Sequence, residues 1–131
     1  MSSGLVRRRE TFSRDDRLRK RREFEECYAA GVRVSGRHLQ LFLLPPGALP
    51  RLGISVPKRA GEAATRNLLR RRVREIFRRN RDLFGSAGGS LVVNVRPSAA
   101  GATFAELAED YKSSLAKLLA LLARTGGRPG R

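Results

Sequence analysis

The sequence predicts a small sandwich of one β-sheet against helices, of the α+β or α/β class. Its 131 residues are enough for a single domain with one modest core. Helical periodicity recurs in three segments, and short apolar runs of strand length stand between them. The expected order is therefore helix, two or three strands, basic helix, strand and helix, with no internal repeat.

Residues 1–15 are polar and basic and are expected to be disordered. A short helix is predicted over roughly Arg21 to Ala30, and Gly31 is suited to end it. Its apolar positions have the helical spacing i, i+3, i+4: Phe24, Cys27 and Tyr28. This helix opens a single predicted domain over residues 16–124.

The strands are expected in three stretches. Val32 to Leu44 is predicted to be extended, with a bulge or bend at Gly36, and its apolar run HLQLFLL indicates two partly covered faces. The proline-rich turn PPGALP separates it from the strand RLGISV, which Pro57 ends. The last strand is LVVNVR, residues 91–96, and Pro97 stops it.

The last helix is expected to begin at Thr103, where the sequence has a capping box with Glu106. Its apolar stripe follows the 3.6-residue period and is interpreted as core: Phe104, Leu107, Ala108, Tyr111, Leu115, Leu118, Leu119 and Leu122. Gly126 and Gly127 are expected to end the helix, and residues 125–131 are predicted to form a flexible tail.

Positive charge is the main compositional feature of the chain. It has 28 Lys and Arg residues against 12 Asp and Glu, a formal net charge of +16. Most of this charge lies in two blocks: residues 7–22 carry nine bases and three acids, and residues 58–81 carry ten bases and two acids. Such clustering describes a surface for a polyanion better than it describes general solubility.

The basic block at residues 58–81 keeps one apolar helical face. Four side chains lie together on that face of a helical wheel: Leu69, Val73, Ile76 and Phe77. Six polar side chains fall on the opposite side: Asn67, Arg70, Arg71, Arg74, Arg78 and Arg81. Guanidinium groups bind phosphate oxygens bidentately and stack on bases, so we expect RNA as the partner. A solvated charged face is the alternative, but such a face normally mixes signs in i,i+4 pairs.

Other function classes find little support in the sequence. Cys27 and His38 are the only residues of their types, which leaves no disulfide framework and no multi-histidine or cysteine-based metal site within one chain. We interpret His38 as an ordinary strand-edge residue. The acids alternate with bases or lie where they favour a helix dipole, so no catalytic carboxylate cluster is expected. No run approaches the ~18 apolar residues of a membrane span, and we expect a cytoplasmic protein with no membrane partner.

Residues 58–74 read KRAGEAATRNLLRRRVR, and this stretch closely resembles the signature of the bacterial ribonuclease P protein subunit, K-[KR]-x-G-x-A-x-x-R-N-R-x-[KR]-R-x-x-R. Other stretches agree in order: RLRKRREFEECYAAG with the family's first helix, GRHLQLFLL and RLGISVPKR with its strands, and LVVNVRP with the strand after the basic helix. The resemblance covers about residues 16–123. Leu68 departs from the usual Arg-Asn-Arg, and we expect neighbouring Arg72 to replace the missing charge.

The resemblance implies an α+β fold with a four-stranded sheet, similar to one domain of a ribosomal protein and of elongation factor G. It also implies a left-handed crossover around the basic helix, where general rules predict a right-handed one. The implied role is that of a noncatalytic protein, monomeric when alone, which binds a large catalytic RNA and precursor tRNA and assists endonucleolytic removal of the 5′ leader. The protein itself is expected to hold no cofactor, and the RNA is expected to hold most of the Mg²⁺ that the holoenzyme requires.

The resemblance assigns two surfaces to these roles. The surface for the catalytic RNA consists of the basic helix and its lead-in: Lys58, Arg59, Arg66, Asn67, Arg70, Arg71, Arg72 and Arg74. The cleft for the single-stranded leader lies between the first helix and the sheet: Phe24, Tyr28, Gln40 and Phe42, with Arg70 and Arg74 at its edge. The residues alone slightly favour Phe24 and Tyr28 as plain core, and the resemblance reverses that order. A structural RNA-binding ribosomal protein is the alternative function, and a protein-only nuclease is a further one.

Overall fold

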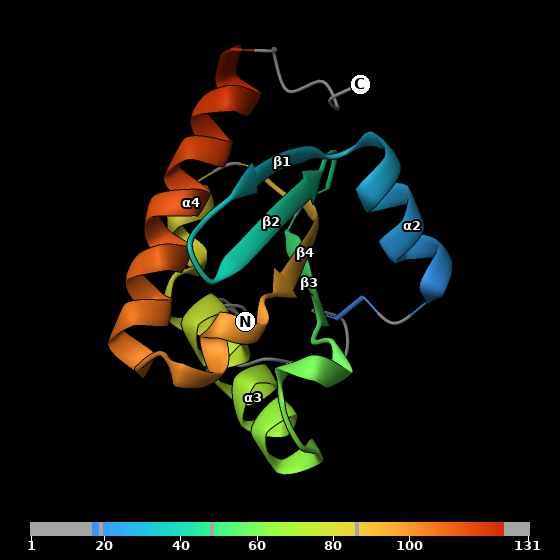
Figure 1. Cartoon of the computed structure of the whole chain (residues 1–131). Helices are drawn as coiled ribbons and strands as arrows, with labels where there is room; N and C mark the ends of the chain where they lie inside the picture. The colour runs from blue at the N-terminus through green and yellow to red at the C-terminus, as the bar shows by residue number, and fades with distance from the viewer. Residues whose placement is uncertain (1–16, 19, 48, 86, 125–131) are drawn as a thin grey trace, which may run out of the picture.

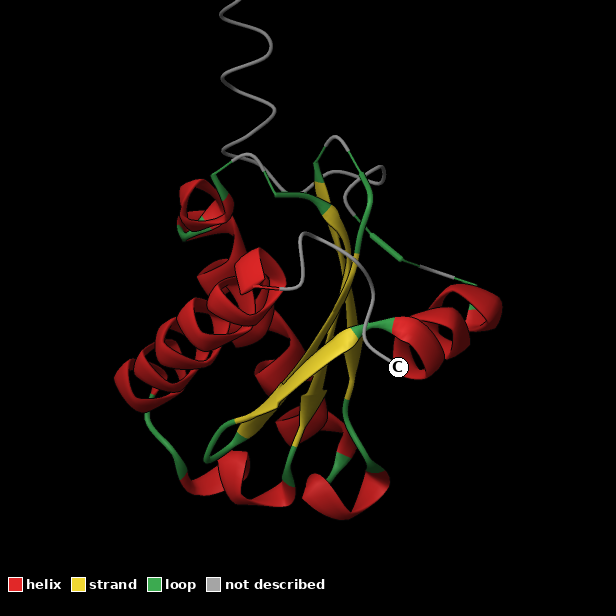
Figure 2. Ribbon diagram, turned by 90° about the horizontal axis from the view of Figure 1, so that it is seen from above, coloured by secondary structure: helices red, strands yellow, loops and turns green. Residues whose placement is uncertain are grey.

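The computed structural model describes residues 17–18, 20–47, 49–85 and 87–124. A four-stranded sheet lies in the middle, with helices on both of its faces (Figures 1 and 2). Helix α2 (Arg21–Ala30) packs on one face, and helices α3 (Ala63–Arg79) and α4 (Phe104–Arg124) pack on the other. This arrangement confirms the α+β class and the four-stranded sheet. Within the described ranges, no helix is both long and apolar enough to traverse a lipid bilayer.

The strands lie in the order β1 (Val32–Ser35), β2 (Leu39–Leu44), β4 (Gly89–Val95) and β3 (Pro50–Ser55). The pairs β1–β2 and β2–β4 are antiparallel, whereas β3 and β4 are parallel. Helix α3 lies in the connection between the two parallel strands, and the left hand of this crossover stays a prediction. Three short 3₁₀ helices complete the described chain: η2 (Lys58–Ala60), η3 (Arg81–Phe84) and η4 (Pro97–Gly101).

The stretch from Val32 to Leu44 is a hairpin rather than one extended run, because helix α4 binds its turn at Gly36. The Asp110 carboxylate of α4 accepts hydrogen bonds from three successive backbone N–H groups of the turn: Arg37 (2.8 Å), His38 (2.8 Å) and Leu39 (2.9 Å). A Cβ atom at Gly36 would lie only 2.4 Å from the Ser114 hydroxyl oxygen, so glycine allows this close approach. The sequence pattern located the bend, and the distant helix determines its shape.

The larger core lies between the sheet and helices α3 and α4. Alternate residues of β2 and β4 point into it: Leu39, Leu41, Leu43, Leu91, Val93 and Val95. The predicted apolar face of α3 is buried as expected: Leu69, Val73, Ile76 and Phe77. The stripe of α4 is confirmed as core, with Leu107, Tyr111, Leu115, Leu118 and Leu122 buried, and Phe104, Ala108 and Leu119 packed partly against them.

A smaller apolar cluster lies under α2 on the other face. It consists of Leu18, Cys27, Phe42 and Val92, with Phe24 and Leu44 packed partly against them. The Cys27 thiol lies 3.4 Å from the Phe42 carbonyl oxygen and 3.3 Å from that of Ser90. Burial raises the pKa of this thiol to about 11, so it acts as a neutral, weakly hydrogen-bonded core residue.

The helix ends agree with most sequence expectations. Helix α2 has the predicted bounds, and the capping box of α4 is present: the Thr103 N–H donates to Glu106 Oε1 at 2.8 Å, and the Glu106 N–H donates to Thr103 Oγ1 at 3.1 Å. Helix α3 starts at Ala63, slightly earlier than expected, and ends before the predicted glycines because the Asn80 amide bonds the Ile76 carbonyl at 2.7 Å. The predicted end segments, residues 1–15 and 125–131, lie outside the described residues.

Candidate nucleic-acid interface

Three cations and one amide lie together on the outer side of α3 and are called here the arginine surface: Arg70, Arg71, Arg74 and Asn67. These side chains line a shallow hollow together with Ala64. Arg70 Nη1 donates to Asn67 Oδ1 at 3.1 Å, which orients both groups along the helix. In the described part of the chain, no carboxylate forms an ion pair with the three arginines.

Electrostatic repulsion makes the arginine surface receptive to anions. Burial lowers the pKa of the Arg74 guanidinium, and the nearby charges of Arg17 and Arg70 lower it further. The backbone of Arg17 forms an isolated bridge with Leu52 of β3, so this charge lies at the β3 edge of the sheet. A phosphate group bound here would relieve the repulsion among these guanidinium groups.

The other arginines of the basic segment bind groups of the protein itself. Arg66 donates to the Gly61 carbonyl at 3.0 Å, while Arg78 and Arg79 each lie 2.6 Å from the Glu75 carboxylate. Hydrogen bonds from Arg78, and then from Arg79, lower the pKa of Glu75 to about 2. Arg81 packs its guanidinium over the Phe77 ring at 5.2 Å. The predicted polar side of the helix is therefore divided, because its C-terminal arginines stabilise the fold.

The lead-in to α3 owes its shape to a glycine. Gly61 has φ +148°, a conformation that L side chains rarely adopt, and a Cβ atom there would lie 2.9 Å from the Thr65 methyl group. Lys58 and Arg59 are exposed in η2, just before this turn. The turn thus places two further cations at the N-terminal end of the arginine surface.

The second candidate surface is a row of polar side chains that crosses the sheet on the α2 side. The strand register aligns four residues on neighbouring strands, here called the polar row: Ser35, Gln40, Asn94 and Ser55. Gln40 Nε2 donates to Ser35 Oγ at 3.0 Å, and the Tyr28 hydroxyl donates to Asn94 Oδ1 at 2.7 Å. Ser55 also hydrogen-bonds the Tyr28 hydroxyl. Helix α2 lies beside this row and does not bury it.

The aromatic side chains beside the polar row differ in exposure. The rings of Tyr28 and Phe42 meet edge to face with centroids 4.9 Å apart, yet Tyr28 is 38% exposed and Phe42 only 7%. Phe24 is half-buried and lies on Gly53, where a Cβ atom would be 2.7 Å from its ring. Phe24 and Phe42 therefore also serve the small core, and Tyr28 offers the more exposed ring.

Comparison with known proteins places the chain in a family. The family model for ribonuclease P matches residues 12–119. The chain belongs to the ribonuclease P protein family. It is 37% identical over 120 residues to the ribonuclease P protein component of Desulfovibrio desulfuricans, with 89% of this chain and 88% of that protein covered. The corresponding Clostridium botulinum protein is 32% identical over 114 residues, with 86% and 96% covered.

Solved structures of the family share the fold. The ribonuclease P protein from Thermotoga maritima matches with a TM-score of 0.68 and 32% identity, covering 79% of this chain and 97% of that one. The Staphylococcus aureus protein matches with a TM-score of 0.69 and 27% identity over the same share of this chain. The role that follows from the family is that of protein subunit of ribonuclease P, and the ribosomal-protein alternative is not favoured.

Leu68, which the sequence analysis gave as a departure from the Arg-Asn-Arg pattern, is 37% exposed. Arg72, one turn further along, donates through Nη1 to the Ala102 carbonyl at 3.1 Å. This bond ties α3 to the segment before α4. The structure thus shows a fold-stabilising contact for Arg72, and its compensation for Leu68 stays a prediction.

The structure brings together several predicted residues and adds others. Tyr28, Gln40 and Phe42 lie side by side as expected, and the position of Arg70 and Arg74 at the cleft edge stays a prediction. Three members of the polar row were not predicted from the sequence: Ser35, Ser55 and Asn94. A signal for Asn94 was present, because a polar residue interrupts the apolar strand LVVNV at an alternate position.

The carboxylates that the structure describes are mostly engaged by donors of the same chain. Glu23 pairs with Arg51 at 3.1 Å, Glu75 binds two arginines, and Glu106 caps α4. Asp110 of α4 binds the β1–β2 turn, because the fold brings the turn to this helix. In the described ranges, no three residues of the His, Cys, Asp and Glu types gather where they could hold a metal ion.

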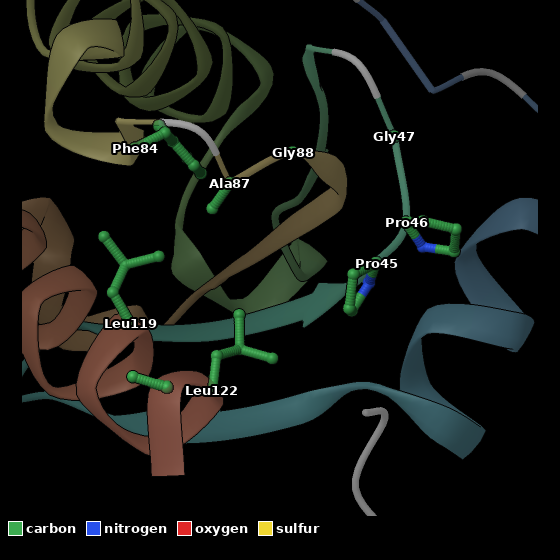
Figure 3. A pocket seen from close by; sticks show the side chains of 9 residues that line it. Pro45, Pro46, Gly47, Phe84, Ala87, Gly88, Leu119 and Leu122 are labelled. Atoms are coloured by element: carbon green, nitrogen blue, oxygen red, sulfur yellow. The ribbon is translucent and has the colours of Figure 1, made fainter. Parts of the chain in front are cut away.

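An apolar pocket lies at the opposite end of the sheet (Figure 3). Its lining includes the residues just after β2 and those just before β4. Leu119 and Leu122 of α4 point into it. Its lining has no charged side chain: Pro45, Pro46, Gly47, Phe84, Ala87, Gly88, Leu119, Leu122 and Ala123. Such a lining does not suit a polyanion, so we assign the RNA contacts to the two surfaces described above.

Proposed function

We propose that this protein subunit binds the catalytic RNA of ribonuclease P through α3 and receives the 5′ leader of precursor tRNA beside α2. The RNA then cleaves the phosphodiester bond at the 5′ end of the mature tRNA sequence. We place this work in the cytoplasm and expect the protein alone to be monomeric. The observation that carries the proposal is that two features occur on one small domain: an arginine surface without ion pairs among the described residues, and a polar row with an exposed ring.

Binding of the catalytic RNA is assigned to the arginine surface together with Lys58 and Arg59. Guanidinium groups without carboxylate partners can exchange water for phosphate oxygens without breaking an internal ion pair. Arg66 and Arg72 hold backbone carbonyls, so we expect their main effect on RNA binding to be the positioning of this surface. The resulting affinity should depend strongly on salt, as phosphate contacts release condensed counterions.

Binding of the leader is assigned to the polar row and the Tyr28 ring. A single strand exposes both base faces and base edges, so an aromatic ring and amide groups together match its chemistry. The side chains of Gln40 and Asn94 each offer donors and an acceptor, and their neighbours Ser35 and Ser55 add hydroxyl groups. These groups can bind different bases, which suits leaders of varied sequence.

Mg²⁺ enters this proposal through the RNA. Four of the described carboxylates already accept hydrogen bonds or ion pairs from the protein: Glu23, Glu75, Glu106 and Asp110. The protein's contribution is charge: its arginines neutralise RNA phosphates that would otherwise require cations from solution. We therefore expect the protein to lower the Mg²⁺ concentration at which the RNA is active.

Reconstitution tests the proposal directly. The protein is mixed with the organism's ribonuclease P RNA, and cleavage of precursor tRNA is followed over a range of Mg²⁺ concentrations. The expected result is activity at low Mg²⁺ only when both components are present. Cleavage by highly purified protein without RNA would contradict the proposal, and so would an RNA whose Mg²⁺ requirement is unchanged by the protein.

A further inference from the structure

The polar row reaches the far edge of the sheet, where β1 carries an arginine on the same side. Arg33 lies directly opposite Phe42 in the β1–β2 register, so its side chain shares the α2 face of the sheet with that ring. Ser35, two residues along the same strand, ends the row through its bond to Gln40. The face therefore presents a cation beside its last polar group.

Arg33 is exposed at the edge of the sheet. Within the residues described, no carboxylate forms an ion pair with it. Arg51 provides the contrast on the same face: it pairs with Glu23 at 3.1 Å and donates to the Arg17 carbonyl at 2.9 Å. Arg51, which the fold holds, and Arg33, which is left for a ligand, thus lie toward opposite edges of the α2 face of the sheet.

The backbone of β1 adds donors at the same place. β1 is the edge strand of the described sheet, and the Gly36 N–H bonds the Leu39 carbonyl at 2.7 Å. Antiparallel ladders alternate between bonded and non-bonded pairs, so the N–H and C=O groups of Ser35 and Arg33 point away from β2. A phosphate at this edge would meet a guanidinium group and backbone N–H donors together.

The opposite end of the row is also cationic. Arg17 lies beside β3, and its charge acts on Arg74 of the arginine surface. The row crosses four adjacent strands, so its two ends lie three strand spacings apart, about 14 Å. This distance is roughly the length of four stacked nucleotides. A single strand entering at β3 would therefore cross uncharged polar groups and reach a second cation at β1.

We propose that Arg33 is a distal leader contact: it binds a backbone phosphate of the 5′ leader after the strand has crossed the polar row. The leader enters from the β3 edge, since the arginine surface that binds the catalytic RNA lies there, and its 5′ portion leaves over β1. This inference rests on the proposed function of the row. It predicts that the protein senses the leader length up to β1 and no further.

The test measures the affinity of the reconstituted holoenzyme for precursor tRNAs with leaders of increasing length, and for mature tRNA. Arg33→Ala is compared with Arg22→Ala, which removes an exposed arginine from α2, and with Arg33→Lys, which keeps the charge. Arg33→Ala should weaken binding about three- to tenfold for leaders long enough to span the row, and leave shorter leaders and mature tRNA unchanged. Its salt slope for long leaders should fall by about 0.7, the value for one phosphate of a single strand.

Three results would overturn the inference. Equal loss for every leader length would place Arg33 on the catalytic RNA or in the fold, and circular dichroism separates these two. An Arg33→Ala variant that matches Arg22→Ala at every length would show that the residue contacts nothing. If the wild-type holoenzyme bound precursors with any leader no better than mature tRNA, the leader cleft itself would be contradicted, and the assignment of Arg33 would fail with it. Retained affinity in Arg33→Lys supports a charge contact.

Discussion

The two faces of the sheet differ although the same strands build both. Toward α3 and α4, alternate residues of β2 and β4 are leucine and valine and are fully or almost fully buried. Toward α2, the intervening residues change along the strand from apolar, at Phe42 and Val92, to polar, at Gln40 and Asn94. The ten-residue α2 covers only the apolar part, so the polar row stays open. One side of each strand thus stabilises the domain while the other serves binding.

The same contrast recurs along α3. Its N-terminal arginines have no carboxylate partner in the described part of the chain, whereas Arg78 and Arg79 share Glu75. Arginines of the same helix therefore have different roles. Those that pair with a carboxylate stabilise the fold, and those that do not are available to bind RNA. The variants below test this division in order of expected effect.

The largest effect is expected on the core face. Leu41→Ala should lower the free energy of unfolding by about 2–5 kcal/mol, because it leaves a cavity in a fully buried site. Gln40→Ala, the adjacent residue on the open face, should change it by less than about 1 kcal/mol. Urea denaturation measures both. Similar losses in the two variants would show that the polar row is part of the core.

Removal of the arginine surface should act on RNA and not on the fold. Replacing Arg70, Arg71 and Arg74 by alanine should reduce the slope of log K against log salt by roughly 0.7–0.9 for each lost phosphate contact. The matched control replaces Arg78, Arg79 and Arg81, which removes the same charge from the other end of the segment. The control should lose stability and keep most of the slope. Equal slopes for the two variants would contradict the division of α3.

The aromatic side chains separate binding from packing. Tyr28→Leu should weaken binding of precursors with a leader by about 1–3 kcal/mol, the value of one base stacked on a ring, and leave mature tRNA unaffected. Phe42→Leu should mainly lower stability, by less than about 1.5 kcal/mol, since this ring is only 7% exposed. Measurements of leader-dependent binding and of melting temperature on both variants decide whether each ring serves binding or packing. A stability loss alone in Tyr28→Leu would leave this ring as core.

The smallest effect concerns Glu75 and acid. Its pKa is lowered from 4.5 to about 2 by hydrogen bonds from Arg78 and Arg79. A depressed pKa contributes stability that is present above pH 4.5 and is lost as the pH falls toward 2. The melting temperature of the wild type should therefore fall further over this range than that of Glu75→Gln. Parallel curves of melting temperature against pH would mean that the ion pairs of Glu75 add no stability, as for many exposed ion pairs.

Much of the fold was predictable because it depends on local periodicity. The buried face of α3 and the Thr103–Glu106 capping box need only residues three or four positions apart, and both are confirmed. The end of α3 was placed too late, since a side-chain cap from Asn80 acts before the glycines do. Gly36 signalled a bend, but the hairpin depends on Asp110, more than seventy positions along the chain.

The candidate site divides in the same way. The sequence by itself determined that a basic helix with one apolar face lies within residues 58–81, because charge and period are properties of neighbouring residues. Only the tertiary structure decided which cations remain without ion pairs, since carbonyls such as that of Ala102 come from other segments. Only strand pairing could align Ser35, Gln40, Asn94 and Ser55, because a row across a sheet joins residues that are distant along the chain.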